Sequence, residues 1–160
     1  IGASNFDAKR LAEAAAISEA KGLPRYERLQ PHYNLMERGL FEGGLENECL
    51  KLGIGVIPHH SLASGFLTGK YRPGTTVESV RASGVEGYAN ERGWSTLAML
   101  EEIGKTHNAP IASIALAWLR AQESIVAPIA SARIASQLDD LLPTPELTDP
   151  ELVALTKVGA

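Results

Sequence analysis

Polar and cationic residues follow directly after the apolar stretch at residues 54–58. Two neighbouring histidines come first, His59 and His60, and then a segment rich in Ser, Gly and Thr that closes with Lys70 and Arg72. A short apolar run of this kind is typical of a strand buried on both faces of a parallel sheet. Exposed backbone amides and two cations suit phosphate groups. We therefore predict an anion-binding loop at the carboxyl end of this strand.

Three other predicted strands are also followed by polar residues. Ser4 and Asn5 come after the first, Gln30 ends the second, and Ser131 and Arg133 follow the last. In parallel α/β folds, ligands bind beyond the carboxyl ends of the strands. Asn, Gln and Ser offer the paired donors and acceptors that a neutral amide needs, whereas arginine suits a phosphate. A ligand that carries both groups is a nicotinamide dinucleotide.

Each of these residues also has an ordinary structural explanation. Asn5 can start a helix, and Gln30 can cap a strand edge. Lys70 and Arg72 can be solvated loop charges. For any one of them taken alone, the structural explanation is the commoner one, so the hypothesis depends on their combination.

The histidines lack the spacing of a metal site. Neighbouring residues on a strand point to opposite faces, so we expect that His59 and His60 do not bind one metal ion together. His32 and His107 show no HExxH-like spacing. We expect one ring of the adjacent pair to face the ligand, where it can stack on a planar group, and the other to pack outward against a helix.

The elements that must position these residues alternate between strand and helix. We predict strands at residues 1–5, 26–30, 54–58 and 125–129, and helices at 7–20, 45–52, 94–107 and 112–122. The segment SARIASQLDDLL begins as a loop and becomes a helix, and a capping box of Thr148 and Glu151 opens a last helix. A long connection covers residues 59–93. This order predicts one α/β domain over residues 1–160, with parallel strands joined by right-handed crossovers.

Length and composition exclude several classes of protein. The 160 residues suffice for one domain but not for a whole eight-unit β/α barrel, which needs about 250. A net charge of −4 argues against nucleic acid as the main partner. We see no run of about 18 apolar residues and no leader segment, so we expect no membrane association. Because Cys49 is the only cysteine, we expect a reducing, cytoplasmic location and a role for it as a small buried hydrophobe.

Four segments at strand ends resemble one family in order and interval. They are IGASNF, RLQPHYNL, GIGVIPHHSLASGFLTGKYRP and VAPIASARIASQLDDLL, and they resemble the C-terminal half of the aldo-keto reductases. The resemblance covers nearly the whole chain. It implies a parallel (β/α)8 TIM-barrel fold, of which about four β/α units are present here. It also implies NADP(H) as cofactor and reduction of aldehydes or ketones, which are small-molecule carbonyl substrates, by hydride transfer.

The resemblance also implies roles for individual residues. It assigns the carboxamide of the nicotinamide to Ser4, Asn5 and Gln30. His59 stands where the family usually has a tyrosine stacked beneath the nicotinamide. The residues implied along the pyrophosphate are Leu62, Ser64, Gly65, Leu67, Gly69 and Lys70, with Arg72 as a further candidate. Those implied at the adenosine and its 2′-phosphate are Ser131, Arg133 and Gln137, with Asp140 near the adenine.

The chain departs from the family pattern in further places. Ile134 follows Arg133 where many members have a second cation or hydroxyl, which leaves the preference between NADP and NAD open. Leu141 replaces a frequent asparagine. The family's catalytic Asp, Tyr, Lys and His lie on the first four strands, whereas this chain begins at what resembles the fifth. We therefore assign no catalytic residue and expect the chain alone to be inactive, because no proton donor matches the motif.

Four parallel strands cut from a barrel would leave two open sheet edges. We expect this surface to be covered by a missing N-terminal half or by self-association with another copy. Beginning inside a strand without a methionine also suggests a piece of a longer chain. The competing interpretations are a non-catalytic dinucleotide-binding or self-associating half-barrel and, less favoured, a sugar-phosphate isomerase, which would need carboxylates at strand ends.

Overall fold

The core of the fold is a parallel sheet of short strands. The computed structural model describes residues 1–75, 77 and 84–160; residues 76 and 78–83 of the predicted long connection lie outside the described part. Strands β1 (Gly2–Ser4), β2 (Arg28–Gln30) and β3 (Gly55–Val56) pair in the order β1-β2-β3, and both pairings are parallel. The predicted α/β class with parallel strands is confirmed.

The fourth predicted strand, residues 125–129, is not a regular strand. It forms one parallel bridge between Val56 and Ile125, and the Val126 N–H donates to the Val56 carbonyl at 2.9 Å. The Ile129 N–H donates to the Pro58 carbonyl at 3.0 Å, so the segment still runs beside β3. Pro58 and Pro128 have no N–H to donate, which removes rungs from the ladder. The predicted strand is therefore wrong as a regular element, although the segment does pair with β3.

The described residues form five α-helices, and all five were predicted. They are α1 (Ala8–Lys21), α2 (Gly44–Leu52), α3 (Glu91–His107), α4 (Ile111–Arg120) and α5 (Asp149–Val158). Asp7 caps α1 by accepting the Arg10 N–H at 2.7 Å, and Gly22 ends it with a left-handed φ of 60°. The segment 131–142 does not become an α-helix, because only the 3-10 turn η4 (Ala135–Asp140) forms there. The described residues also form the 3-10 elements η1 (Ala63–Thr68) and η3 (Glu86–Tyr88).

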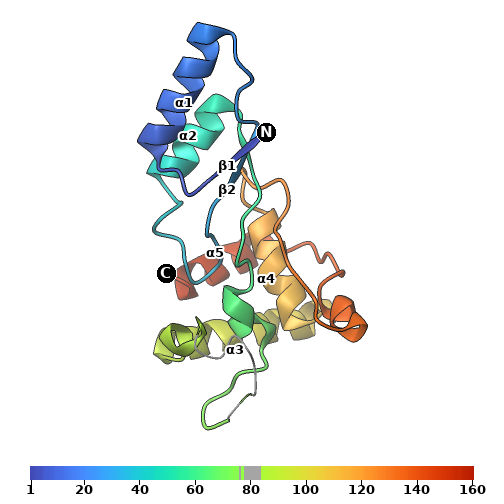
Figure 1. Cartoon of the computed structure of the whole chain (residues 1–160). Coiled ribbons are helices and arrows are strands. Elements are labelled where there is room, and N and C mark those ends of the chain that lie inside the picture. The colour runs from blue at the N-terminus through green and yellow to red at the C-terminus, as the bar shows by residue number, and fades with distance from the viewer. Residues whose placement is uncertain (76, 78–83) are drawn as a thin grey trace.

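The helices form two groups at opposite ends of the sheet (Figure 1). Helices α1 and α2 pack against each other beside β1 and β2, whereas α3 packs against both α4 and α5. Among the described helices, none combines the length and the hydrophobicity needed to cross a membrane.

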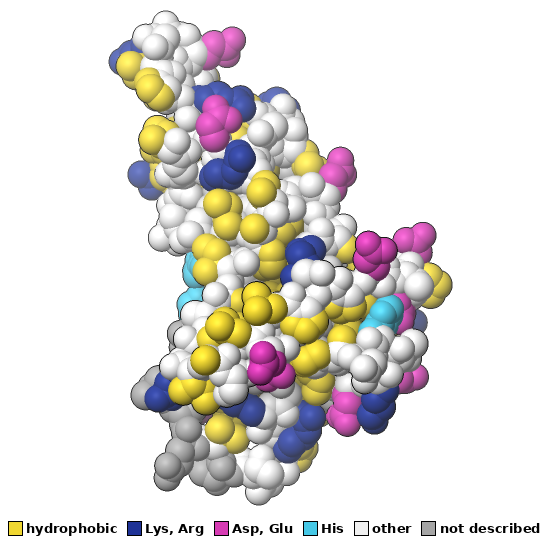
Figure 2. Space-filling model, turned by 90° about the vertical axis from the view of Figure 1, so that its right-hand side faces the viewer, with side chains coloured by type: hydrophobic (Ala, Val, Ile, Leu, Met, Phe, Trp, Pro, Cys, Tyr) yellow, Lys and Arg dark blue, Asp and Glu magenta, His cyan; other side chains and the backbone are white. Residues whose placement is uncertain are grey.

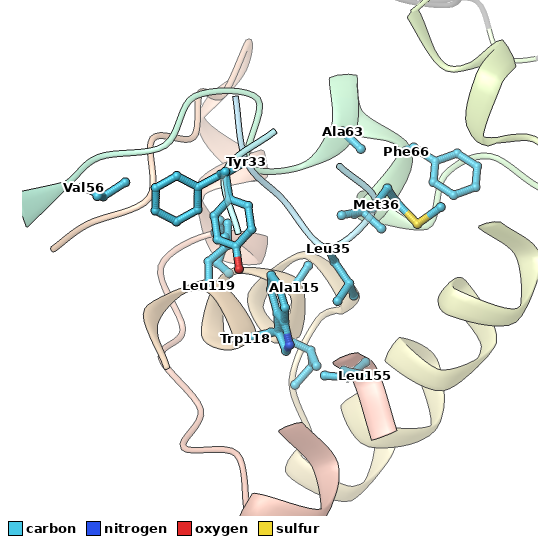
Figure 3. Packing of buried hydrophobic residues seen from close by; sticks show 14 of the residues in the cluster. Tyr33, Leu35, Met36, Val56, Ala63, Phe66, Ala115, Trp118, Leu119 and Leu155 are labelled. Carbon is cyan, nitrogen blue, oxygen red and sulfur yellow. The ribbon is translucent and has the colours of Figure 1, made fainter. Parts of the chain in front are cut away.

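Helix α4 supplies the centre of the hydrophobic core (Figure 3). All residues from 112 to 119 are buried, so α4 is covered on every side. Trp118 is fully buried beside Tyr33, with ring centroids 5.7 Å apart, and its Nε1–H donates to Thr156 Oγ1 at 3.0 Å. Cys49 is also fully buried, and burial raises the pKa of its thiol to about 11. This confirms its predicted role as a small buried hydrophobe.

Candidate functional site

A pocket of about 430 Å³ opens beyond the carboxyl end of β3. Its walls come from the segment that follows β3, from residues 129–141 and from the first turn of α4. Nine of the residues assigned above to a cofactor line it, namely His59, Leu62, Ser64, Gly65, Lys70, Ser131, Arg133, Gln137 and Asp140. Two loops far apart in the sequence therefore meet at one cavity, and both contribute a cation.

Sequence reasoning did not assign seven further residues of the pocket wall. They are His60, Ser61, Thr68, Ala112, Ile129, Ala130 and Leu141. Most of them lie next to assigned residues in the sequence, so assigning whole loops to the site, rather than single residues, would have included them. Ala112 could not have been found in this way, because a small residue in an apolar helix gives no sign of a ligand.

The turn η1 forms the wall that follows β3. Ala63, Ser64 and Gly65 all have positive φ, at 49°, 56° and 91°. For the two residues with a side chain this left-handed backbone is strained, and such strain is concentrated at functional sites. Lys70 extends over Gly65, where an added Cβ would lie 3.6 Å from the Lys70 Nζ. That distance is an ordinary contact, so glycine is favoured at this position by its φ of 91° rather than by the space that Lys70 needs.

The opposite wall is held by hydrogen bonds between loop and helix. The Arg133 backbone N–H donates to Gln137 Oε1 at 2.7 Å, and Ser113 Oγ donates to the Asp140 carbonyl at 2.7 Å. The second bond fixes η4 against α4. The first turn of α4 reaches the pocket at Ala112, and no side chain caps this helix start. The positive end of a helix dipole therefore adds to the two cations.

The predicted carboxamide residues come together beside this pocket rather than in its wall. Ser4 and Gln30 are partners in the pairing of β1 with β2, and Ser4 Oγ donates to the Gln30 carbonyl at 3.1 Å. Asn5 follows with a positive φ of 57°, and all three residues are exposed. They share the carboxyl edge of the sheet with His59, which comes after β3, but their cofactor role stays a prediction.

Three other assigned residues also lie outside the pocket wall. Leu67 is fully buried, its backbone included. Gly69 ends η1 with a φ of 77°. The Arg72 guanidinium lies 3.4 Å from Glu101 Oε2 and also donates to the Tyr71 carbonyl. The geometry gives each of these residues a structural role, and their cofactor contacts stay predictions.

The histidines are arranged differently from the expectation. His59 and His60 were expected to diverge, but their ring centroids lie 5.1 Å apart, and His32 joins them at 5.4 Å and 5.0 Å. The expectation was wrong because β3 ends at Val56 and His60 takes a positive φ of 56°, so strand alternation does not apply. Within the described part of the chain, no group of three or more His, Cys, Asp or Glu residues is placed to hold a metal ion.

Comparison with known families gives one match that spans nearly the entire chain. Residues 1–159 match the model of the aldo/keto reductase family. This agrees with the resemblance described for the four strand-end segments.

Individual relatives agree with this match. The chain is 32% identical over 147 residues to an aldo-keto reductase of Fusarium vanettenii, covering 89% of this chain and 38% of that protein. It is 31% identical over 118 residues to the L-glyceraldehyde 3-phosphate reductase of Escherichia coli O157:H7, covering 69% and 34%. It is 30% identical over 158 residues to the oxidoreductase YrpG of Bacillus subtilis, covering 97% and 47%. The chain therefore spans less than half the length of each of these relatives.

Proposed function

This chain belongs to the aldo/keto reductase family, and we propose that it forms the cofactor-binding half of an NADP(H)-dependent oxidoreductase that reduces aldehydes or ketones. The observation that supports this most strongly is the pocket in which Lys70 and Arg133, from two separate loops, face one cavity. Two cations and a helix start at one cavity suit a ligand with several phosphates. When bound, the coenzyme supplies the hydride.

The residues present fit such a coenzyme at both ends. The His59 Nδ1 is buried and, within the described residues, has no hydrogen-bond partner, which is the kind of polar atom that a ligand satisfies. Gly65 adopts the φ of 91° that the turn η1 needs, and Lys70 extends over it. In the proposal, Lys70 and the η1 amides hold the pyrophosphate, Arg133 reads the 2′-phosphate, and the residues after β1 and β2 orient the carboxamide.

In this proposal the chain binds the coenzyme but does not catalyse the reaction by itself. Reduction of a carbonyl needs a proton donor near the developing alkoxide, and none of the residues in the pocket wall matches the family's catalytic tyrosine and lysine. We propose that the donor and the substrate pocket come from a partner that completes the barrel, either an N-terminal half or another copy. The alternative is a half-barrel that binds the dinucleotide, or only self-associates, with no catalysis.

Isothermal titration calorimetry with NADPH and with NADH tests this proposal. We expect the unaltered chain to bind both, and Arg133→Ala to weaken NADPH about tenfold, because a charge-assisted contact to the 2′-phosphate is lost. NADH lacks that phosphate, so its affinity should change less than twofold. Arg10→Ala, at an exposed arginine of α1, is the matched control and should leave both affinities unchanged.

Three outcomes would contradict parts of the proposal. If neither coenzyme binds, the dinucleotide function is wrong and only the self-associating alternative is left. Equal losses for NADPH and NADH would show that Arg133 does not read the 2′-phosphate. Turnover of a carbonyl substrate by this chain alone would show that a proton donor is present after all.

A further inference from the structure

Three imidazole rings gather at the carboxyl ends of β2 and β3. His32, His59 and His60 form this histidine cluster, and each pair of ring centroids is separated by 5.0 to 5.4 Å. His32 and His59 are joined by a parallel bridge just beyond the regular strands. The cluster therefore lies at the carboxyl ends of the strands, as do Ser4, Asn5 and Gln30, the residues proposed to bind the carboxamide.

One asparagine holds the cluster in place. Asn34 is fully buried, and its Nδ2 donates to the His60 carbonyl at 2.9 Å and lies 3.4 Å from His32 Nε2. Its Oδ1 accepts the backbone N–H groups of Met36 and Glu37 at 2.8 Å and 3.0 Å. Asn34 thereby joins the loop after β2 to the segment after β3, through the His32 ring on one side and the His60 backbone on the other.

Two rings of the cluster line the pocket, namely His59 and His60. His59 is partly buried, and its Nδ1 has no partner within the described residues. Any charge on these two rings acts directly on a ligand in the pocket. Among the described residues, the other charged groups that line the pocket are Lys70, Arg133 and Asp140.

Like charges at this separation repel, so the cluster carries one positive charge more readily than two. Burial is the main cause that lowers the pKa of His32, the neighbouring imidazoles lower it further, and Glu37 acts in the opposite sense. His32 therefore favours its neutral form, whereas His59 and His60 are the rings of the cluster that line the pocket. An ordinary histidine changes charge near pH 6.5, within reach of a binding experiment.

We propose that the charge on the histidine cluster sets which redox form of the nicotinamide coenzyme the pocket prefers, an inference that rests on the proposed function. The oxidised nicotinamide ring carries a positive charge, whereas the reduced ring is neutral. An imidazolium next to this ring repels the oxidised form and leaves the reduced form unaffected. Acidification thus favours the reduced coenzyme, and the neutral cluster at higher pH removes the discrimination.

Calorimetric titration with NADP⁺ and NADPH at pH 6.0 and pH 8.0 tests the inference. Both forms carry the same phosphates. Any effect of pH on the phosphates, or on Lys70 and Arg133, therefore changes both affinities equally and drops out of their ratio. We expect the affinity for NADP⁺ relative to NADPH to fall about fivefold from pH 8.0 to pH 6.0. His59→Phe keeps a flat ring without the charge, and in this variant the change of the ratio with pH should be clearly smaller, because His60 is then the one pocket-lining imidazole of the cluster.

Two further variants keep the test decisive. His60→Gln removes a more exposed ring of the cluster and should reduce the shift even if His59→Phe does not fold. His107→Gln, outside the pocket, is the matched histidine control and should keep the full shift. An unaltered ratio at both pH values in the original chain, or a full shift in both cluster variants, would overturn the inference while leaving the proposed function intact. Absence of binding by either coenzyme at both pH values would instead contradict the proposed function itself.

Discussion

Glu42 is the hub of a charged network beside the core. Arg38 donates to it through Nε at 2.6 Å and Nη2 at 2.8 Å, and the Tyr33 hydroxyl donates at 2.9 Å. Although burial opposes it, the hydrogen bonds from Arg38 and Tyr33 hold the pKa of Glu42 below its usual value. The Arg38 guanidinium also lies 5.7 Å from the Trp118 ring. The network therefore joins the loop after β2 to the buried centre of α4.

Substituting Glu42→Gln should destabilise the protein by about 2 kcal/mol, because Arg38 is left partly buried without its carboxylate. Urea denaturation at a fixed protein concentration measures the change in the free energy of unfolding. Glu13→Gln is the matched control, since Glu13 and its partner Lys9 have side chains that are 61% and 86% exposed, and it should cost less than about 0.5 kcal/mol. Equal effects of the two substitutions would show that the network adds nothing beyond a surface pair.

The side chains of the site were predictable where they follow strands and unpredictable where the backbone is unusual. Lys70 and Arg133 could be assigned to one cavity because both come after predicted parallel strands. The histidine cluster could not, since it depends on the positive φ of His60, which a residue other than glycine seldom adopts. The position of a ring that depends on an unusual backbone conformation cannot be predicted from the spacing of residues in the sequence.

Among the helices, α5 shows how a local signal fixes an element. The Thr148 N–H and hydroxyl both donate to Glu151 Oε2 at 2.8 Å, in the capping box that the sequence predicts. Glu151 Oε1 lies 2.9 Å from His107 Nε2 in the last turn of α3. One carboxylate therefore caps α5 and joins it to α3.

This carboxylate should make stability depend on pH in the acid range. The Thr148 backbone N–H is the main cause that lowers the pKa of Glu151, followed by the Thr148 hydroxyl and His107. A lowered pKa in the folded state means that the stabilisation is present above the unfolded value, about 4.3, and is lost as the pH falls through the folded value. Glu151→Gln should therefore flatten the dependence of the thermal midpoint on pH below about 5.

Thermal denaturation between pH 3 and pH 7 measures this dependence. Glu123→Gln, at an exposed position, is the control and should leave the acid limb of the curve unchanged. Identical curves for Glu151→Gln and for the unaltered chain would contradict the role of the cap in acid stability.

Capped helices were predictable because their signals are local, whereas the last strand and η4 depend on tertiary context. Asp7 and Gly22 flank α1, and Thr148 with Glu151 opens α5. Each of these helix ends is therefore determined by residues close to it in the sequence. Residues 125–129 have the composition of a strand, but proline in this segment and in its neighbour prevents a full ladder. Residues 135–140 stop at a 3-10 turn that is fastened to α4 by Ser113.

The molecule as a whole presents a sheet with two uncovered edges. Within the described residues, β1 pairs only with β2, and segment 125–129 pairs only with β3. Val126 is 58% exposed at the second edge, and Figure 2 shows hydrophobic side chains gathered across one face of the molecule. An open edge of this kind is a template for pairing with another strand.

We expect the isolated chain to self-associate through this edge, and Val126→Lys to weaken the association severalfold, because a charge on an edge strand opposes pairing. Sedimentation velocity over a range of protein concentrations measures it. Val153→Lys is the matched control, since Val153 on α5 is similarly exposed at 67% but lies away from the sheet edge. A monodisperse monomer of 17.1 kDa at every concentration, or equal effects of the two lysines, would contradict this expectation.

The two tryptophans of the chain occupy different surroundings, which gives the protein a built-in optical reporter. Trp118 is sealed in the core, whereas Trp94 is only partly buried and packs at 5.5 Å from Phe66 in the turn η1. Emission from the partly buried Trp94 therefore reports on the pocket wall formed by η1, whereas emission from the enclosed Trp118 reports on loss of the core. A single spectrum can thus separate loosening of η1 from global unfolding.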